Sequence, residues 1–228
     1  MNAETVAQGK CKRCGVDIAE GKDWCGKECY CQDKADRFWA KLPNAYRQTA
    51  TDRLPKPLHS QRVIEWQPDR ERNQVGLVLI GGSGAGKTRT ALLALKRLAE
   101  TGAAHVDRVT RLNWIQGYTL ATDIARRTRP GGDGDFEEWL EASLLSPTAL
   151  LLDDVDKTRW SGRVKQEFAG LIEHRTANGL VTLVTMNCAG ADLARAIGPE
   201  FGPTTLRRLA ETSQVIDFDA ELEPDEFD

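Results

Sequence analysis

Residues 81 to 88 constrain this chain more than any other segment, because they read G-x-x-x-x-G-K-T. The run from 75 to 80 before them is apolar, as a buried strand is, and residues 89 to 99 repeat leucine at helical spacing. A glycine-rich loop between a strand and a helix lets backbone N–H groups approach a phosphate, and the helix dipole adds positive potential. We therefore predict a phosphate-binding P-loop rather than a chance glycine-rich turn.

The motif also predicts roles for single residues. Lys87 is expected to reach the β- and γ-phosphates of ATP, and the Thr88 hydroxyl is expected to bind Mg²⁺. The residues expected to contact the nucleotide are Gly82, Ser83, Gly84, Ala85, Gly86, Lys87, Thr88 and Arg89.

A second motif supplies the acids that ATP hydrolysis needs. Residues 148 to 152 form another short apolar run, which ends in Asp153 and Asp154. Because parallel strands bring their carboxyl ends to one edge of a sheet, we expect both acids beside the P-loop. Asp153 would hold Mg²⁺ through water, and Asp154 would polarise the attacking water. Aspartate is one methylene shorter than the more common glutamate at that position, so we expect slow turnover.

Two later segments complete the predicted ATPase. Residues 180 to 185 form a β-branched apolar run just before Asn187, whose amide could position the lytic water. Residues 204 to 211 read as a short basic helix that contains Arg207 and Arg208. These arginines are either a solvated helix face or a contact to the γ-phosphate of a neighbouring subunit.

The order of these motifs resembles that of an AAA+ ATPase. Residues 153–157 and 207–216 resemble in particular the DnaC/IstB-like group of replicative-helicase loaders and transposition helper ATPases. The resemblance covers residues 63 to 219, about two thirds of the chain. It is carried by the P-loop, Asp153-Asp154, Thr185-Met186-Asn187 and Arg207-Arg208-Leu209.

The resemblance implies an α/β fold with a five-stranded parallel sheet flanked by helices. It implies that Asn187 takes the sensor-1 position and that Arg208 is an arginine finger supplied in trans, with Arg207 as the alternative. It further implies self-association through ATP-bound interfaces and no helical lid after Phe218. An acidic tail stands where many members of the group carry arginines.

The amino terminus carries separate chemistry. Five of the six cysteines lie between residues 11 and 31, in a segment that follows a polar start with no signal peptide. Two close thiolate pairs suit tetrahedral zinc, and a reducing cytosol disfavours disulfides. We predict that Cys11, Cys14, Cys25 and Cys29 bind zinc, with Cys31 as an alternative to Cys29.

These motifs divide the chain. We expect a zinc-binding module with a trailing helix at 1–42, a linker at 43–62, the AAA+ ATPase domain at 63–219 and an acidic tail at 220–228. The prolines of the linker favour an extended tether. The net charge of −3 gives no overall nucleic-acid signature, and no apolar stretch is long enough to cross a membrane. We expect a cytoplasmic protein that uses ATP, Mg²⁺ and Zn²⁺.

Three functions fit this division. The first is an ATPase that loads a replicative DNA helicase, engages it through the zinc module, contacts single-stranded DNA and belongs to a phage or mobile element. The second is a transposition helper that binds duplex DNA and recruits a transposase. The third is a nucleotide-gated adaptor with little turnover. Stimulation of hydrolysis by single-stranded or by duplex DNA would separate the first two.

Overall fold

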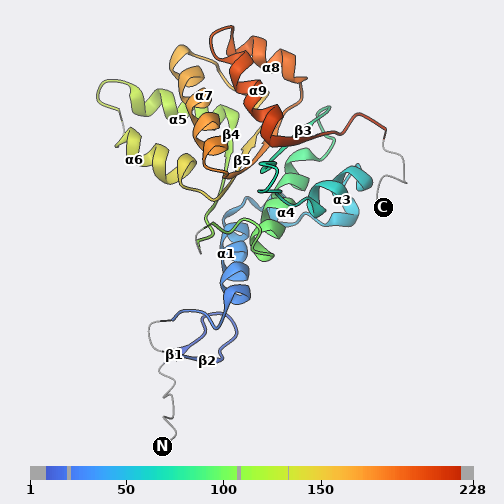
Figure 1. The fold of residues 1–228 in the computed structure, drawn as a ribbon, viewed down its shortest axis with the longest axis vertical. Coiled ribbons are helices and arrows are strands. Elements are labelled where there is room, and N and C mark those ends of the chain that lie inside the picture. The colour runs from blue at the N-terminus through green and yellow to red at the C-terminus, as the bar shows by residue number, and fades with distance from the viewer. Residues whose placement is uncertain (1–8, 20–21, 107–108, 133, 222–228) are drawn as a thin grey trace, which may run out of the picture.

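The computed structural model describes residues 9–19, 22–106, 109–132 and 134–221. Its centre is a parallel sheet of five strands in the order β4 (Leu112–Gln116), β5 (Ala149–Asp153), β6 (Val181–Thr185), β3 (Gly76–Ile80) and β7 (Ser213–Asp217) (Figure 1). The strands are short and rich in Val, Leu and Ile, as strands covered on both faces usually are. The sheet is the one expected from the sequence.

One face of the sheet is covered by α1 (Lys27–Lys41), α3 (Pro57–Glu65) and α4 (Lys87–Glu100). Side chains alternate along a strand, so Leu77 and Leu79 point to this face. They pack there against the fully buried leucines of α4 and against Phe38 of α1. This layer joins the P-loop helix to the amino-terminal part of the chain.

The other face is covered by α5 (Gly117–Thr128), α7 (Gly162–Ala177), α8 (Gly190–Ile197) and α9 (Gly202–Thr212). Val78, between the two leucines of β3, points to this side and packs with residues of these helices. Between α5 and β5 the chain forms α6 (Phe136–Leu140) and one π-helical turn, Glu141–Leu145. The molecule therefore has three layers, with the sheet in the middle.

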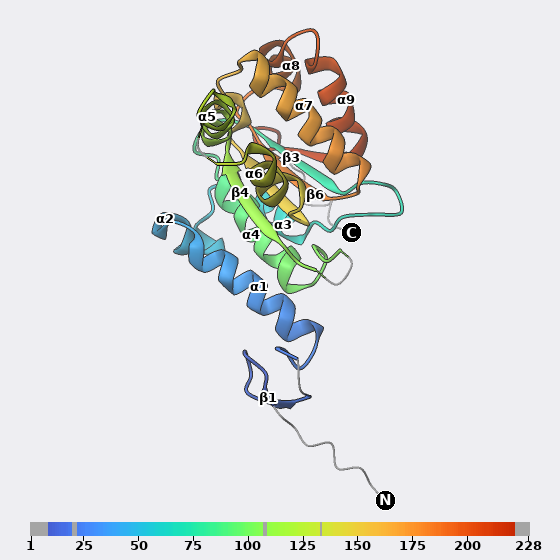
Figure 2. The ribbon, with the colours of Figure 1, turned by 90° about the vertical axis from the view of Figure 1, so that its left-hand side faces the viewer.

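The cysteine-rich segment lies at one end of the molecule. A short antiparallel pair, β1 (Gly9–Lys10) and β2 (Asp17–Ile18), leads to α1, which runs from this segment to the sheet domain (Figure 2). The trailing helix expected in this module is α1. Its side chains contact α4 directly, since Gln32 donates a hydrogen bond of 3.0 Å to Glu100 and the Lys96 ammonium lies 5.3 Å from the Trp39 ring centre.

Residues 43–62 differ from the expected extended tether. They form α2 (Asn44–Arg47), a 3₁₀ turn at Thr51–Arg53 and the first part of α3, so the expected boundary at 62/63 falls inside a helix. Pro57 is in the first turn of α3, where its missing N–H costs nothing. Leu42 and Leu54 are buried on either side of α2. Burial of these apolar side chains holds the segment on the sheet domain instead of leaving it in solvent.

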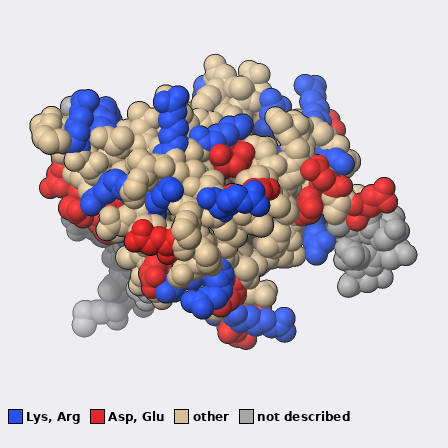
Figure 3. All heavy atoms as spheres, turned by 90° about the horizontal axis from the view of Figure 1, so that it is seen from above, with Lys and Arg blue, Asp and Glu red and all other residues tan. Residues whose placement is uncertain are grey.

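The distribution of charge on the surface agrees with the modest net charge of −3. The face farthest from the cysteine-rich segment carries Lys and Arg side chains scattered among Asp and Glu side chains (Figure 3). Within the described residues, none of the helices has the length and apolar character needed to cross a membrane.

Candidate functional site

The P-loop lies between β3 and α4, as the sequence predicts. Gly84 and Gly86 have φ angles of +84° and +91°, a region that favours glycine, and Gly86 is the residue from which α4 starts. The first backbone N–H groups of α4 consequently open onto a cleft of about 350 Å³. The lining of the cleft comprises Tyr46, Arg53, Pro55, Ser83, Gly84, Gly86, Lys87, Thr88, Arg89, Asp154, Lys157 and Asn187.

Lys87 is held at the centre of this cleft. Its ammonium donates hydrogen bonds to the carbonyls of Gly81 (2.7 Å) and Gly82 (2.8 Å) and to the Asn187 side-chain oxygen (3.0 Å). Lys87 is 5% exposed, and burial lowers the pKa of its ammonium below the ordinary value, against the opposing effect of nearby acids such as Asp154. A cation held by neutral oxygens is well placed to exchange them for phosphate oxygens.

Asp153 and Thr88, the two residues predicted to hold Mg²⁺, lie next to each other. The Thr88 hydroxyl donates a hydrogen bond of 2.7 Å to Asp153 Oδ1, and the Thr185 hydroxyl donates one of 2.6 Å to the same oxygen. Burial raises the pKa of Asp153 above its ordinary value, and the two hydroxyl groups act in the opposite direction. The other oxygen, Oδ2, is buried and has no hydrogen-bond partner among the described residues. A buried carboxylate oxygen left free beside a hydroxyl fits a hard divalent cation.

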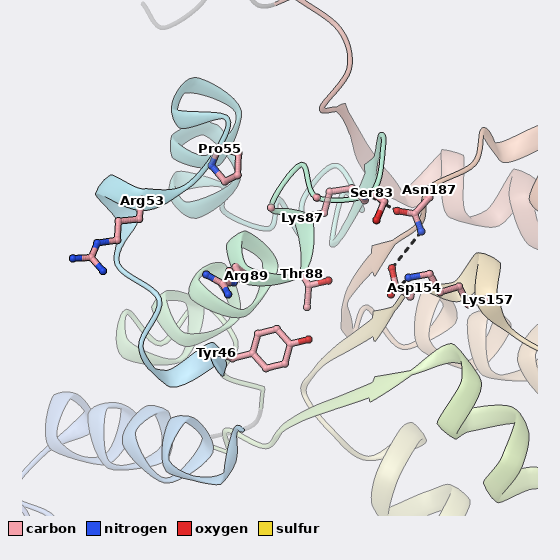
Figure 4. Close-up of a pocket in the computed structure, with 12 residues that line it drawn as sticks. Tyr46, Arg53, Pro55, Ser83, Lys87, Thr88, Arg89, Asp154, Lys157 and Asn187 are labelled. Carbon is pink, nitrogen blue, oxygen red and sulfur yellow. Dashed lines mark hydrogen bonds and ion pairs between the residues drawn. The ribbon is translucent and has the colours of Figure 1, made fainter. Parts of the chain in front are cut away.

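Asp154 lies beside Asn187 across the cleft from Tyr46 (Figure 4). Its backbone is left-handed, with φ +51°, and its N–H donates to the Thr185 hydroxyl at 2.9 Å. The Asp154 carboxylate contacts the Lys157 ammonium at 2.6 Å and the Asn187 amide at 3.4 Å. The acid expected to polarise water is thus already paired with a lysine of its own chain.

Asn187 connects the lysine and the acids. Its side-chain oxygen accepts from Lys87, and its amide nitrogen donates to the Asp156 carboxylate at 3.0 Å. The backbone N–H of Asn187 also donates to Asp156, at 2.9 Å. Five predicted residues therefore meet in one place, namely Lys87, Thr88, Asp153, Asp154 and Asn187.

Arg208 does not line this cleft. It lies on α9, and its guanidinium contacts the Glu173 carboxylate of α7 at 2.6 Å, beside a separate cavity of about 310 Å³. Its neighbour Arg207 is more exposed, at 67% of the side chain against 31%, and contacts Glu211 at 3.7 Å. Neither arginine can serve the site of its own chain from these positions, so any role at a γ-phosphate requires a second subunit.

Four cysteines come together at the amino-terminal end. The sulfur atoms of Cys11, Cys14, Cys25 and Cys29 all lie within 4.8 Å of one another. Tetrahedral zinc with bonds of about 2.3 Å places its sulfur ligands about 3.8 Å apart, so the spacing fits that ion. Cys31 lies elsewhere: it is 1% exposed, and its sulfur points at the α4 end near Gly102.

The thiols of this cluster differ in pKa. The backbone N–H of Cys14 lowers the pKa of Cys11 to about 6, whereas hydrogen bonds with Cys29 and Cys14 raise the pKa of Cys25 to about 12. Several thiolates cannot ionise side by side without a cation. A divalent metal would remove that cost, because it binds the thiolate form.

Comparison with solved structures finds proteins of similar fold. The DnaC helicase loader is similar over 79% of this chain and 98% of that chain, with a TM-score of 0.53 and 20% sequence identity. DnaI is similar over 79% and 93%, with a TM-score of 0.56 and 14% identity. AMPPCP-bound DnaA from Aquifex aeolicus is similar over 78% and 51%, with a TM-score of 0.53 and 16% identity.

The chain has an AAA+ fold. At these identities the likeness establishes the fold alone. No protein-family model matches the chain, and neither does any curated protein.

Several residues of the site were not singled out from the sequence. Thr185 belongs to one of the quoted motifs but has no predicted role of its own, yet its hydroxyl contacts both the Asp154 N–H and the Asp153 carboxylate. Asp156 was part of the quoted run 153–157 without a role, and it holds Asn187. Tyr46 enters the cleft from the expected linker. A second acid two residues after Asp154 was the one sequence signal that could have identified Asp156.

Proposed function

We propose that the chain is an ATP-dependent loader of a replicative DNA helicase. The observation that carries the proposal is that Lys87, Asp154 and Asn187 line one cleft, in a fold shared with the DnaC helicase loader. Asp153 adjoins this cleft through its hydrogen bond with Thr88. The paired carboxylate, hydroxyl and lysine match the requirements of phosphoryl transfer, in which positioning and charge neutralisation do most of the work.

Each residue has a defined task in this proposal. Thr88 and Asp153 would hold Mg²⁺, which neutralises charge on the phosphates when bound. Lys87 would give up its contact with Asn187 and bind the β- and γ-phosphates, so Asn187 would become free to orient a water molecule. Asp154 would first break its ion pair with Lys157 and would then accept a proton from that water.

Hydrolysis in this scheme needs a neighbouring subunit. Arg208 is 31% exposed and would have to leave Glu173 to reach a γ-phosphate bound by another chain. Such an arginine stabilises the negative charge that develops in the transition state. Assembly would therefore control turnover, and a subunit alone would hydrolyse ATP slowly.

The zinc module would engage the helicase. Support comes from its position: the cysteine cluster lies at the end of α1 that points away from the sheet domain (Figure 2). A surface held by a metal at the end of a helix can contact a large partner without covering the ATP site.

A second function, the nucleotide-gated adaptor, has one observation in its favour. The Lys157 ammonium lies 2.6 Å from the Asp154 carboxylate and occupies one of its oxygens, so that oxygen is not free to accept a hydrogen bond from water. If this pair persists when ATP is bound, the chain would bind nucleotide and signal its presence without turning it over.

One experiment separates these functions. The full chain is mixed with the replicative helicase of its source organism in ATP, in ADP and without nucleotide, and complexes are resolved by size-exclusion chromatography while phosphate release is measured. A loader should form an ATP-dependent complex that Cys14→Ser abolishes and the control Cys188→Ser retains. Absence of a complex in every nucleotide state refutes the proposal. A complex with ATP bound and no phosphate released favours the adaptor, and stimulation by duplex DNA without a complex favours the transposition helper.

A further inference from the structure

A second cleft, of about 490 Å³, lies between α1 and the start of β4, beside the face of α1 that packs in the core with α4. One wall is α1 and the other is formed by residues 110–113 with the π-helical turn before β5. Figure 2 shows α1 running beneath β4 in this region. Four cationic side chains line the cleft, and no acidic residue is in its lining: Lys34, Arg37, Lys41 and Arg111.

The three cations of α1 form a row. Positions 34, 37 and 41 are three and four residues apart, so they share one face of the helix and extend over about 10 Å of its axis. Arg111 faces them from the other wall. Such a row offers successive contacts to an extended chain of negative charges.

Most of this charge is not neutralised within the protein. Arg37 contacts Asp33 at 2.9 Å, and Lys34 lies 5.2 Å and 5.5 Å from the ring centres of Tyr30 and Trp24. Lys41 and Arg111 are exposed, and neither forms an ion pair with any acid in the described part of the chain. By contrast, the face farthest from the cysteine cluster mixes both signs (Figure 3). The cleft is therefore a local basic surface on a chain whose net charge is −3.

We propose that this cleft binds one strand of nucleic acid through its phosphates. A groove with cations on both walls follows a single backbone, as single-strand sites do. The aromatic pair Trp24 and Tyr30, whose ring centres lie 5.0 Å apart, stands at the zinc end of the row beside Lys34. A duplex, which carries phosphates on two strands around a wide cylinder, would meet only the rim of such a cleft. The inference rests on the proposed loader function, because the sequence analysis expects such a loader to contact single-stranded DNA.

The test is a binding measurement on the full chain. Fluorescence anisotropy follows a labelled oligothymidylate longer than the roughly 4–16 nucleotides that one such domain covers. The variant Lys41→Ala/Arg111→Ala removes two cations from opposite walls. Its control, Arg72→Ala/Arg195→Ala, removes two cations with side chains 80% and 78% exposed that do not line the cleft. A second control, Lys41→Arg/Arg111→Lys, keeps the charge.

Counterion release sets the expected size of the effect. Each phosphate contact to a single strand contributes about 0.7 to the slope of log affinity against log salt. Loss of two contacts should make the slope shallower by about 1.4 and weaken binding about 25-fold at 0.1 M salt, since 10 to the power 1.4 is about 25. The charge-keeping variant should bind like the wild type, and the distant pair should change affinity much less.

Four results would overturn the proposal: no binding by the wild type, equal losses in the cleft and distant variants, tighter binding of the same sequence as a duplex, or equally tight binding of polyglutamate. ATP binding is measured in the same samples. If the wild type binds ATP and the helicase but not the oligonucleotide, only the proposal for the cleft is rejected. If it binds the oligonucleotide but not the helicase, the loader function is rejected.

Discussion

Thr185 allows the sharpest test of the ATP site. Its hydroxyl donates to Asp153 Oδ1 at 2.6 Å and accepts the Asp154 N–H at 2.9 Å, and the residue is fully buried. Thr185→Val keeps the shape of the side chain and removes both hydrogen bonds. A hydrogen bond to a charged group contributes about 1.5–3 kcal/mol, so Mg²⁺ should bind roughly 10- to 150-fold more weakly in the presence of ATP.

The change should also alter the pH dependence. Burial already raises the pKa of Asp153, and the Thr185 hydroxyl is the largest influence that lowers it. Below its pKa the carboxyl is protonated and cannot hold a metal, so Mg²⁺-dependent binding is lost as pH falls. Without the hydroxyl the pKa of Asp153 rises further, and this loss should begin at a higher pH in Thr185→Val than in the wild type.

The assay is calorimetric titration of ATP at several Mg²⁺ concentrations and pH values. Thr185→Ser keeps the hydroxyl and should behave like the wild type. ATP binding without Mg²⁺ should change little, because Lys87 does not contact Thr185. An unaltered Mg²⁺ requirement in a folded Thr185→Val protein would refute the assignment of Asp153 as the metal carboxylate.

Substitutions elsewhere in the chain test the P-loop, the cysteine cluster, the arginine finger and the buried arginine of α7. Lys87→Ala removes a charge-assisted contact of about 1.5–3 kcal/mol and should weaken ATP binding roughly tenfold or more by calorimetry; unchanged affinity would contradict the P-loop assignment. The wild type should carry one zinc per chain by elemental analysis and Cys14→Ser should carry none, whereas a metal-free wild type with normal partner binding would defeat the zinc hypothesis. Arg208→Ala and Asp154→Asn should each bind ATP without hydrolysing it and should recover activity when mixed; failure in a sample shown to exchange subunits would make Arg208 a surface residue. Arg175→Met should lower the free energy of unfolding by about 3–5 kcal/mol in urea, because it removes the donor that the buried carbonyls of Leu144, Pro147 and Val181 share, and a loss under 1 kcal/mol would contradict this account.

The sequence predicts those parts of the site that depend on local patterns. The P-loop string fixes its own backbone through glycines such as Gly84 and Gly86, whose φ angles are positive in the structure. Asp153 and Asn187 could be placed because each follows a run of buried-strand type, and parallel strands end at the same edge. The cysteine pairs could be predicted because Cys14 follows closely after Cys11 and Cys29 closely after Cys25, so the thiols of each pair must lie near each other.

The remaining contacts depend on which strands are neighbours. Thr185 reaches Asp153 because β5 and β6 are adjacent, a pairing that no local pattern specifies. The short β4 was not identified as a strand, since Asn113 and Gln116 interrupt its apolar run. Likewise, the pairing of Arg208 with Glu173 requires α9 to pack on α7, and these helices are far apart in the sequence.

The buried segment between the modules changes what zinc loss should do. If the segment were a flexible tether, loss of zinc would not change ATP binding. Instead, α1 starts at the cysteine cluster and ends just before α2, whose Tyr46 lines the ATP cleft and packs 5.2 Å from Trp114. Phe38 and Leu42, in the second half of this helix and just after it, pack in the main core rather than against the cysteine cluster. Loss of zinc should therefore release the segment before α1 while α1 itself stays in place, so ATP binding persists for a different reason from the one a tether would give. If chelation also unfolds α1, ATP affinity should fall with it, which calorimetry on the chelated protein would reveal.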